Sequence, residues 1–427
     1  MPDSRRIVAV VLAAGLGKRL RSSAPKVLAR VAGRPLLSHV LRALGALSVA
    51  RTVVVVGHGA DEVEKEFGGA GVEFARQREQ RGTADALLAA KAALAGHSGP
   101  VIVLYGDTPR LRAEALTTLL DSHRASGAAA SLLTAERPDP EGYGRVIRDA
   151  GGEVADIRED RDLTAEERGI REFNPGVYCF EAPLVFEALP RIGSRNAQGE
   201  LYLTDVVRVL RSMGHRVAAV RWPRAGELDG VNTPEELIAA GRGLRGDILA
   251  DLVRGGVDVL DPEKTYVEAD VAVGEGTVIL PFTVIQAGVR IGKGCRVGPF
   301  ARLREGTVLE DGAEVGDFVE TKNARIGPRT KVLHLSYIGD ADLGAAVNVG
   351  AGTITANYDG RRKNRTTIRD RAFVGSGTVL VAPVDVGEDS IVGAGAVVTR
   401  GTTVKAREVY VGVPARKLKD RPEEDRP

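Results

Sequence analysis

Short aliphatic runs alternate with amphipathic segments of helix length over the first half of the chain. Residues 7–12 (IVAVVL), 52–56 (TVVVV) and 101–104 (VIVL) are almost wholly apolar, and stretches such as PLLSHVLRALGAL and TADALLAAKAALAG lie between them. Apolar strands separated by helices are typical of a parallel sheet that helices cover on both faces. We therefore predict an α/β domain, in which the turns that follow the strands face one ligand site.

A different period begins at Val267. Aliphatic residues recur at every sixth position from there to Val315, and the same spacing resumes from Ile368 to Val404 after a change of phase. Periods of 3.6 or 2.0 residues cannot produce this pattern. A parallel β-helix does, because each coil buries one aliphatic side chain on each flat side. The aromatic content of 4% suits so narrow a core.

These two patterns predict the domain organisation. The α/β domain is expected over residues 1–232, a linker helix over 233–256 and the β-helix over 257–418. A charged tail over 419–427 follows, and the segment KLKDRPEEDRP that contains it is expected to be disordered.

The N-terminus allows two interpretations. Arg5 and Arg6 followed by IVAVVLAAG imitate the charged and apolar regions of a secretory signal. A glycine-rich turn with cations stands where a cleavage site should be, so we interpret the run as a buried first strand.

Composition narrows the possible partners. The 427 residues are enough for two or three domains, and 59 Lys and Arg against 57 Asp and Glu leave a net charge of +2. No basic run is interleaved with aromatics, so nucleic acid is not an expected partner. No apolar run approaches the ~18 residues of a membrane span. Cys179 and Cys295 are far apart and are expected to be packing residues, which suits a reducing, cytoplasmic location.

Two strand-end turns carry candidate phosphate chemistry. Gly15 and Gly17 would let backbone N–H groups approach phosphates, although the same glycines also fit a plain tight turn. A second strand, VIVLYGD, ends in Asp107, whose carboxylate could hold Mg2+ against phosphates. The first turn is followed by four cations: Lys18, Arg19, Arg21 and Lys26. Of these, Arg21 is expected to be a solvated surface charge.

The motifs of the first half resemble those of sugar-1-phosphate nucleotidyltransferases. LAAGLGKRL with PKVL is followed in order by QREQRGTADAL, YGD, GYGRV, NAQGELYLTD and GVN. Together with the motifs of the second half, this order resembles one family over nearly the whole chain. Its members join an N-acetylglucosamine-1-phosphate uridylyltransferase to a glucosamine-1-phosphate N-acetyltransferase and so make UDP-N-acetylglucosamine.

The resemblance implies a first set of site residues. Arg19 and Lys26 would act on the phosphates, Asp107 and Asn232 would bind Mg2+, and Gln80 would lie near the nucleotide. UTP and N-acetylglucosamine 1-phosphate would contact Leu12, Ala13, Ala14, Gly15, Lys26, Gln77, Gly82, Thr83, Tyr105, Gly106, Asp107, Gly144, Glu159, Asn174 and Asn232.

A second set lies where the hexapeptide repeat is interrupted. A lone histidine such as His334 is more often a surface or packing residue, but an imidazole can take the proton from an amine that attacks a thioester. RLREG, VETKNARIG, HLSYIGD and VNVGAGTITANYDG resemble the acetyltransferase motifs of the family, which implies a left-handed β-helix, a trimer and His334 as general base. Arg304 and Lys322 would hold the phosphate of glucosamine 1-phosphate, and Tyr337 and Asn348 would hold its sugar ring. Acetyl-CoA would contact Ala351, Asn357, Tyr358, Lys363, Ser376 and Ala394. The cations of GRRKNR around Lys363 could also belong to a solvated loop.

Three departures from the family pattern are visible. Pro175 stands where a threonine is usual, and Gly412 stands where an arginine often contacts CoA, a role that Arg416 could take. The segment between Asn232 and Arg304 is shorter by about two coils of ~18 residues.

Two alternatives remain open. The chain could be a single-activity nucleotidyltransferase whose β-helix only assembles an oligomer, or a non-enzymatic scaffold or sensor of sugar nucleotides. CoA release from acetyl-CoA with glucosamine 1-phosphate tests the first alternative. Pyrophosphate release from UTP with N-acetylglucosamine 1-phosphate tests the second.

Overall fold

The computed structural model describes residues 6–15, 17–20 and 24–420. The chain divides into two compact units, Met1–Arg242 and Gly243–Pro427, called here the front unit and the β-helix unit. Within the described residues, no helix is both long enough and apolar enough to cross a membrane.

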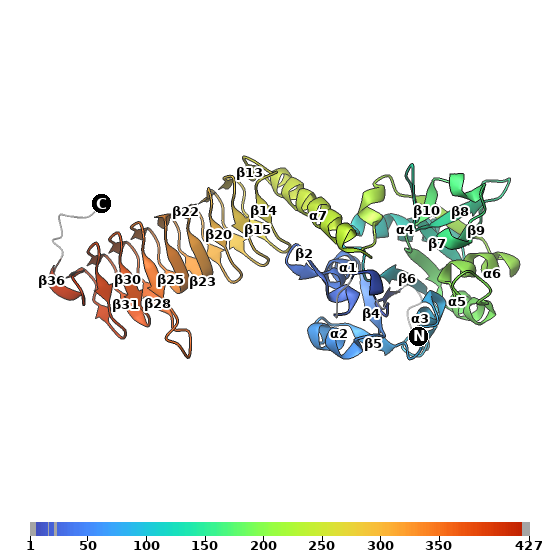
Figure 1. Cartoon of the computed structure of the whole chain (residues 1–427), viewed down its shortest axis with the longest axis horizontal. Coiled ribbons are helices and arrows are strands. Elements are labelled where there is room, and N and C mark those ends of the chain that lie inside the picture. Colours follow the sequence, from blue (N-terminus) through green and yellow to red (C-terminus); the bar gives the residue numbers. More distant parts are fainter. Residues whose placement is uncertain (1–5, 16, 21–23, 421–427) are drawn as a thin grey trace. The chain divides into compact units, whose positions relative to one another are not determined.

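The front unit is built on a ten-stranded sheet (Figure 1). One part of it is parallel and consists of β1 (Ile7–Leu12), β4 (Val49–Val56), β5 (Glu73–Arg76) and β6 (Pro100–Tyr105), in the order β5-β4-β1-β6. The sheet continues through β7 (Ala130–Glu136), β8 (Gly144–Arg148), β9 (Val154–Arg158), β10 (Glu172–Asn174), β11 (Tyr178–Glu181) and β12 (Val217–Arg221). In this second part β11 runs antiparallel to both β6 and β7. A small separate hairpin pairs β2 (Arg30–Val31) with β3 (Arg34–Pro35).

Helices cover both faces of this sheet, as the apolar strands predict. The side chains of β1 alternate between two apolar clusters, with Ala9 and Val11 on one face and Val8 and Val10 on the other. The first cluster is covered by α1 (Leu36–Gly45), α2 (Ala60–Phe67) and α4 (Ala113–Ser126). The second is covered by α3 (Thr83–Ala89), α5 (Ala182–Ala188) and α6 (Val206–Ser212). The buried position of β1 confirms the interpretation of the N-terminal apolar run as a strand.

Single-turn helices complete the front unit. They are η1 (Lys18–Leu20), η2 (Lys26–Leu28), η3 (Asp160–Asp162), η4 (Glu167–Gly169), η5 (Leu189–Arg191), η6 (Leu203–Asp205) and η7 (Ala225–Leu228). The helix α7 (Pro234–Arg254) lies inside the segment where a linker helix is predicted.

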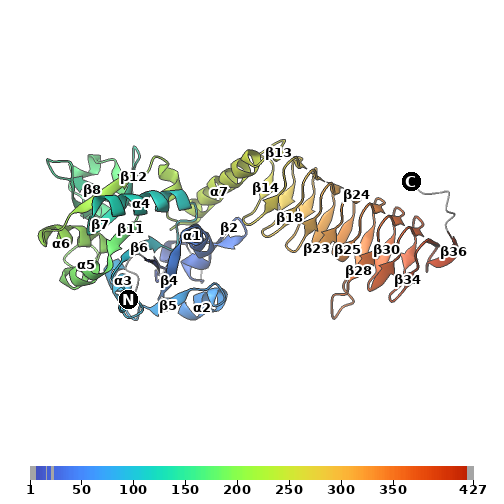
Figure 2. The same ribbon diagram turned by 180° about the vertical axis from the view of Figure 1, so that it is seen from behind.

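The β-helix unit stacks short parallel strands in three ladders (Figure 2). The first ladder is β13 (Asp258–Val259), β16 (Val278–Ile279), β19 (Arg296–Val297), β22 (Glu314–Asp317), β24 (Lys331–His334), β26 (Asn348–Val349), β29 (Phe373–Val374), β32 (Ile391–Val392) and β35 (Glu408–Val411). The second is β14 (Tyr266–Val267), β17 (Val284–Ile285), β20 (Arg302–Leu303), β23 (Glu320–Ile326), β25 (Tyr337–Leu343), β27 (Ile354–Ala356), β30 (Val379–Val381) and β33 (Val397–Val398). The third is β15 (Ala272–Val273), β18 (Arg290–Ile291), β21 (Val308–Leu309), the far ends of β23 and β25, β28 (Thr366–Ile368), β31 (Val384–Val386) and β34 (Thr403–Val404).

The sixth-position aliphatics form the core of this unit. All of those expected are buried except Val273, which is partly buried and packs against the same core. The six-residue pattern therefore predicted the parallel β-helix correctly, and the family resemblance supplied its left-handed sense. Strict coils repeat every 18 residues, as in the pairing of Val278 with Arg296. The coils around His334 are one residue shorter, since Glu314 pairs with Lys331.

The charged C-terminal segment corrects one expectation. Its first residues are ordered and form β36 (Arg416–Asp420), which runs antiparallel to β35. Lys417 makes an ion pair with Glu408 at 2.9 Å, which fixes this strand to the last coil. The remaining residues of the expected tail, 421–427, lie outside the described residues.

Candidate functional site

A cavity of about 550 Å³ opens at the carboxyl ends of β1 and β6 in the front unit. Most residues selected by sequence line it: Leu12, Ala13, Ala14, Gly15, Arg19, Lys26, Gln77, Gln80, Gly82, Thr83, Tyr105, Asp107, Gly144, Glu159, Asn174 and Asn232. Gly106 does not line the cavity, but a Cβ atom at this position would lie 3.2 Å from Val27, which does. Arg21 lies outside the described residues.

Other lining residues were missed by the sequence analysis. They are Val27, Ala86, Thr108, Gly142, Tyr143, Glu200 and Gly230, while Pro175, noted only as a departure, also lines the cavity. Several of them stand inside the motifs GYGRV, GELYLTD and GVN, so the motifs themselves carried the signal.

Lys26 lies between the two candidate metal ligands. Its ammonium group makes an ion pair with the Asp107 carboxylate and donates a hydrogen bond to Asn232 Oδ1 at 3.0 Å. Lys26 begins η2, Asp107 follows β6, and Asn232 precedes α7. Two oxygen ligands that already face a cation form a suitable start for a Mg2+ site, because Mg2+ takes one or two protein oxygens and completes its shell with phosphates and water. Among the described residues, no three His, Cys, Asp or Glu side chains gather as a metal-binding group.

Gly17 brings the turn against Lys26. Its φ is +59°, and a Cβ at this position would lie 2.8 Å from Lys26 Cβ. The position therefore requires glycine for both its backbone conformation and its packing. The glycine-rich turn and the candidate phosphate-binding lysine are thus parts of one local structure.

Buried hydrogen bonds hold the part of the cavity wall that contains Asn174. Asn174 donates to the Tyr178 hydroxyl at 2.6 Å and accepts from the Gly176 backbone N–H at 3.2 Å. Gly176 has φ +84°, and a Cβ there would overlap the Tyr105 ring. Burial is the main cause that raises the pKa of Tyr105, so its hydroxyl remains protonated near neutral pH.

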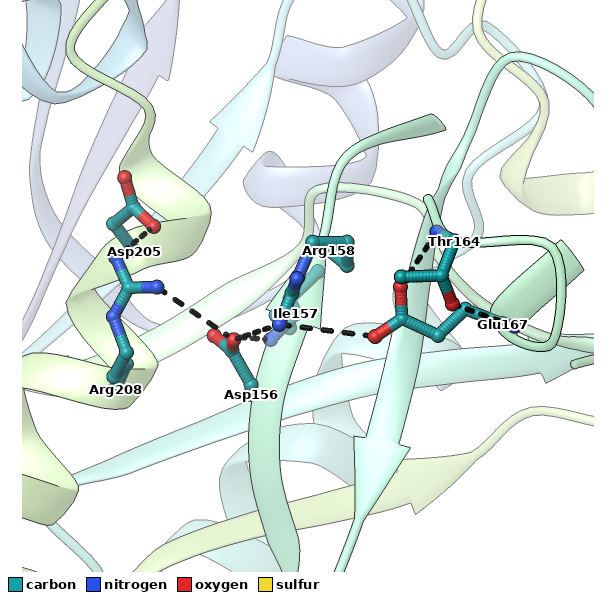
Figure 3. A network of polar contacts seen from close by, with 7 residues as sticks. All are labelled: Asp156, Ile157, Arg158, Thr164, Glu167, Asp205 and Arg208. Carbon is teal, nitrogen blue, oxygen red and sulfur yellow. Dashed lines mark hydrogen bonds and ion pairs between the residues drawn. The ribbon is translucent and has the colours of Figure 1, made fainter. Parts of the chain in front are cut away.

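Glu159 contributes a buried carboxyl group to the same cavity. Burial is the main cause that raises its pKa, and a hydrogen bond from Thr204 Oγ1 at 2.9 Å opposes that shift. An ion pair joins the strand β9, which leads to Glu159, to the helix α6 (Figure 3). Asp156 contacts Arg158 and Arg208, and Arg208 also contacts Asp205.

His334 ends β24 on the β-helix, where it is exposed and pairs in register with Asp317. It lines a groove of about 210 Å³ together with Arg296, Gly298, Pro299, Glu314, Val315, Gly316, Asp317 and Leu333.

Three of the residues expected to contact acetyl-CoA continue the column of His334. The backbone N–H groups of Gly352, Gly377 and Gly395 donate to the carbonyl oxygens of His334, Ala351 and Ser376, at 3.3, 2.7 and 2.8 Å. Ala351, Ser376 and Ala394 therefore occupy equivalent positions on successive coils. A histidine followed by small side chains leaves an open track along this edge.

The candidate sugar-phosphate residues fall on two ladders. Arg304 directly follows β20, and Lys322 and Tyr337 belong to β23 and β25, whereas Asn348 belongs to β26 in the ladder of His334. Arg304 makes an ion pair with Glu320 at 2.7 Å. The neighbouring Lys363 side chain is the main cause that lowers the pKa of Lys322. Two ammonium groups this close favour an anion between them.

The loop after β27 carries the remaining candidates, Asn357, Tyr358 and Lys363 (Figure 2). It is internally bonded, because Tyr358 forms a bridge with Lys363 and the Asp359 carboxylate accepts from the Arg361 and Arg362 backbone N–H groups. Farther along, Gly412 has φ +94°, a conformation that an arginine would adopt only with strain.

Comparisons with known proteins agree with both halves of this description. Residues 9–173 match the family of MobA-like NTP transferase domains, and residues 270–305 and 365–400 match the bacterial transferase hexapeptide family. "Bifunctional protein GlmU" of Pelotomaculum thermopropionicum is 46% identical over 412 residues, which cover 89% of this chain and 90% of that protein. The GlmU protein of Shouchella clausii is 42% identical and covers 92% and 93%. The chain belongs to the GlmU family.

GlmU membership makes the chain a bifunctional transferase, with a UDP-N-acetylglucosamine diphosphorylase activity and a glucosamine-1-phosphate N-acetyltransferase activity. It also calls for a divalent metal at the nucleotidyltransferase site. A solved UDP-glucose pyrophosphorylase complexed with UDP-glucose is 16% identical with a TM-score of 0.47, and the alignment covers 57% of this chain and 99% of that one. That likeness is too low to add to the assignment.

Proposed function

We propose that the cavity of the front unit carries the uridylyl transfer. An oxygen of N-acetylglucosamine 1-phosphate attacks the α-phosphorus of UTP, a new P–O bond forms, and the bond to the β-phosphate oxygen breaks to release pyrophosphate. The nucleophile is already anionic, so the site needs no base and accelerates the reaction by positioning and charge neutralisation.

The contact of Lys26 with Asp107 and Asn232 carries this proposal. Asp107 and Asn232 would hold Mg2+, which would neutralise phosphate charge when bound. Lys26 and Arg19 would bind the phosphates, the turn at Gly15 would wrap the nucleotide with Gln77, Gly82 and Thr83, and Glu159 with Asn174 would hold the sugar.

We propose that the β-helix carries the acetyl transfer, with His334 as general base. The amine nitrogen of glucosamine 1-phosphate attacks the thioester carbon of acetyl-CoA, an N–C bond forms and the C–S bond breaks. His334 takes the amine proton, and the CoA thiolate leaves and is protonated. The open track beyond His334 supports the placement of acetyl-CoA along Ala351, Ser376 and Ala394, and the close pair Lys322 and Lys363 supports an anion site beside it.

We propose further that the protein is a cytoplasmic homotrimer. Both cysteines are buried free thiols, which suits a reducing compartment. Three exposed phenylalanines on successive coils stack on one another, with ring centroids 4.8 and 5.1 Å apart for Phe282–Phe300 and Phe300–Phe318. Exposed apolar surface of this kind favours an interface between copies.

Two variants test whether the two reactions take place at separate sites. We expect Asp107→Ala to abolish pyrophosphate release from UTP while CoA release continues, and His334→Ala to do the reverse. Loss of both activities in either folded variant would contradict two independent sites. The assays need only wild-type protein and each variant, with Mg2+ present throughout.

A further inference from the structure

Asp340 is a buried carboxylate for which the proposed acetyl transfer gives no role. It lies within β25 with φ +48° and is only 7% exposed. A charge in such a place is tolerated when hydrogen bonds satisfy it. Two carboxamides do so, since Asn323 Nδ2 donates to Oδ1 at 2.6 Å and Asn357 Nδ2 donates to Oδ2.

This pairing fixes which way the Asn357 carboxamide points. An ionised carboxylate only accepts hydrogen bonds, so the NH2 end of Asn357 must face Asp340 and its carbonyl oxygen must face away. Asn357 is 8% exposed, and within the described part of the chain its Oδ1 has no hydrogen-bond partner. That atom is not fully buried either, because it is not among the buried side-chain oxygens that lack a partner in the described residues, which are those of Asp162, Thr283 and Thr366. Asn357 thus presents an unused acceptor to the outside.

The acceptor lies in the wall of the proposed acetyltransferase site. Asn323 directly follows Lys322, and the negative charge of Asp340 also acts on the Lys322 ammonium. Tyr337 stands on the same strand as Asp340, and Lys363 stands on the same loop as Asn357. Both substrates of the proposed reaction carry N–H donors, namely the amine of glucosamine 1-phosphate and the amides of the pantetheine arm of acetyl-CoA.

We propose that Asp340 is a positioning residue, which orients Asn357 so that its carbonyl oxygen accepts a hydrogen bond from a substrate N–H. This rests on the acetyl transfer proposed above. Asp340 itself touches no substrate. Its role is to exclude the flipped orientation of the Asn357 carboxamide. In that orientation the Asn357 NH2 group would face the substrate N–H, and two donors cannot form a hydrogen bond.

A charge-removing but nearly isosteric substitution tests the orientation. In Asp340→Asn, two donating amides face a group with a single acceptor, so one of them must turn over. We expect kcat/KM for acetyl transfer to fall by 10-fold or more, while uridylyl transfer and the melting temperature stay at the wild-type values. The double substitution Asp340→Asn with Asn323→Asp should restore much of the rate, because the moved carboxylate again dictates one orientation.

A double-mutant cycle with Asn357→Ala separates positioning from a structural effect. If Asp340 acts through Asn357, Asp340→Asn should have no further effect once the Asn357 carboxamide is removed. An increase in KM for acetyl-CoA would identify the pantetheine amide as the donor, and a fall in kcat at unchanged KM for acetyl-CoA would identify the amine. Both results support the proposal.

Additive losses of kcat/KM in the double-mutant cycle, or an unchanged kcat/KM in Asp340→Asn, would overturn the proposed positioning role of Asp340. Failure of the swapped pair to recover any rate would also count against it. If the wild-type protein released no CoA from acetyl-CoA with glucosamine 1-phosphate, the proposed acetyl transfer itself would be wrong, which is a separate result.

Discussion

The Lys26 ammonium group makes an ion pair with Asp107, and both side chains are only about 15% exposed. Lys26 therefore lies where a divalent cation would contact Asp107 and Asn232. A cation that binds this pair must displace the ammonium group, which is then free to meet the phosphates of UTP.

Replacing Lys26 with methionine should have opposite effects on metal binding and on catalysis. We expect Lys26→Met to bind Mn2+ more tightly than wild type in the absence of nucleotide, because the competing charge is gone. Uridylyl transfer should fall by about 10²-fold to 10³-fold, the usual loss for one preorganised charge contact. Mn2+ titration by electron paramagnetic resonance gives the first value, and pyrophosphate release gives the second.

Acetyl transfer is the internal control for this variant, because Lys26 lies in the other unit from His334. An unchanged Mn2+ affinity would show that the ammonium group does not compete for these oxygens.

Gly176 gives a second prediction, because it supports the Tyr105 ring beside the cavity. A methyl group at this position would overlap that ring, and the φ of +84° already disfavours other residues. We expect Gly176→Ala to lower the free energy of unfolding by about 2–4 kcal/mol and to impair uridylyl transfer. Gly214→Ala is the matched control, since Gly214 has the same φ and nothing within 4 Å of the added atom. Thermal unfolding measures the free energy of unfolding of both variants. Equal losses of this free energy in the two variants would contradict the role of the ring contact.

Much of the fold could be predicted because burial repeats in the sequence with the period of each structure. The alternation of β1 between two clusters and the sixth-position aliphatics of the β-helix both follow from this. The antiparallel insertion of β11 between β6 and β7 could not be predicted, since the pairing of short strands depends on contacts distant in sequence.

The candidate sites show a similar limit. The motifs selected most of the residues that line the front cavity, but not that Lys26 would lie between Asp107 and Asn232. Asp340 ends the motif HLSYIGD, but the motif does not show that this carboxylate is buried between Asn323 and Asn357 of other coils. Sequence therefore indicated the chemistry of each site better than its contacts.

The phenylalanine stack gives a test of the proposed trimer. Phe282, Phe300 and Phe318 are 47%, 46% and 58% exposed, and Leu335 extends the stripe on the next coil at 64%. We expect Phe300→Glu to shift the protein from trimer to smaller species in size-exclusion chromatography with light scattering, because a charge would be buried in an apolar contact. Val253→Glu, at 51% exposure on α7, is the control and should leave the mass unchanged. A trimeric Phe300→Glu variant would place the interface elsewhere.

His123 predicts an acid-sensitive front unit. Its ring lies 2.9 Å from Ser131 Oγ and 3.2 Å from Glu181 Oε1. Burial is the main cause that lowers the pKa of His123, although Glu181 opposes the shift. Around the ordinary histidine pKa of about 6.5, the unfolded chain therefore binds more protons than the folded one. The stabilisation is complete above that value and is lost as the pH falls through the lower pKa of the folded state.

We expect the free energy of unfolding to drop over this interval by at most about 1.4 kcal/mol per pH unit from this one group. Urea unfolding at each pH measures this free energy. The fluorescence of Trp222 reports on the front unit, because it is the single tryptophan and lies in that unit. His123→Gln should remove this part of the pH dependence, whereas His97→Gln should retain it. A pH profile that is the same in wild type and His123→Gln would assign the acid sensitivity to other groups.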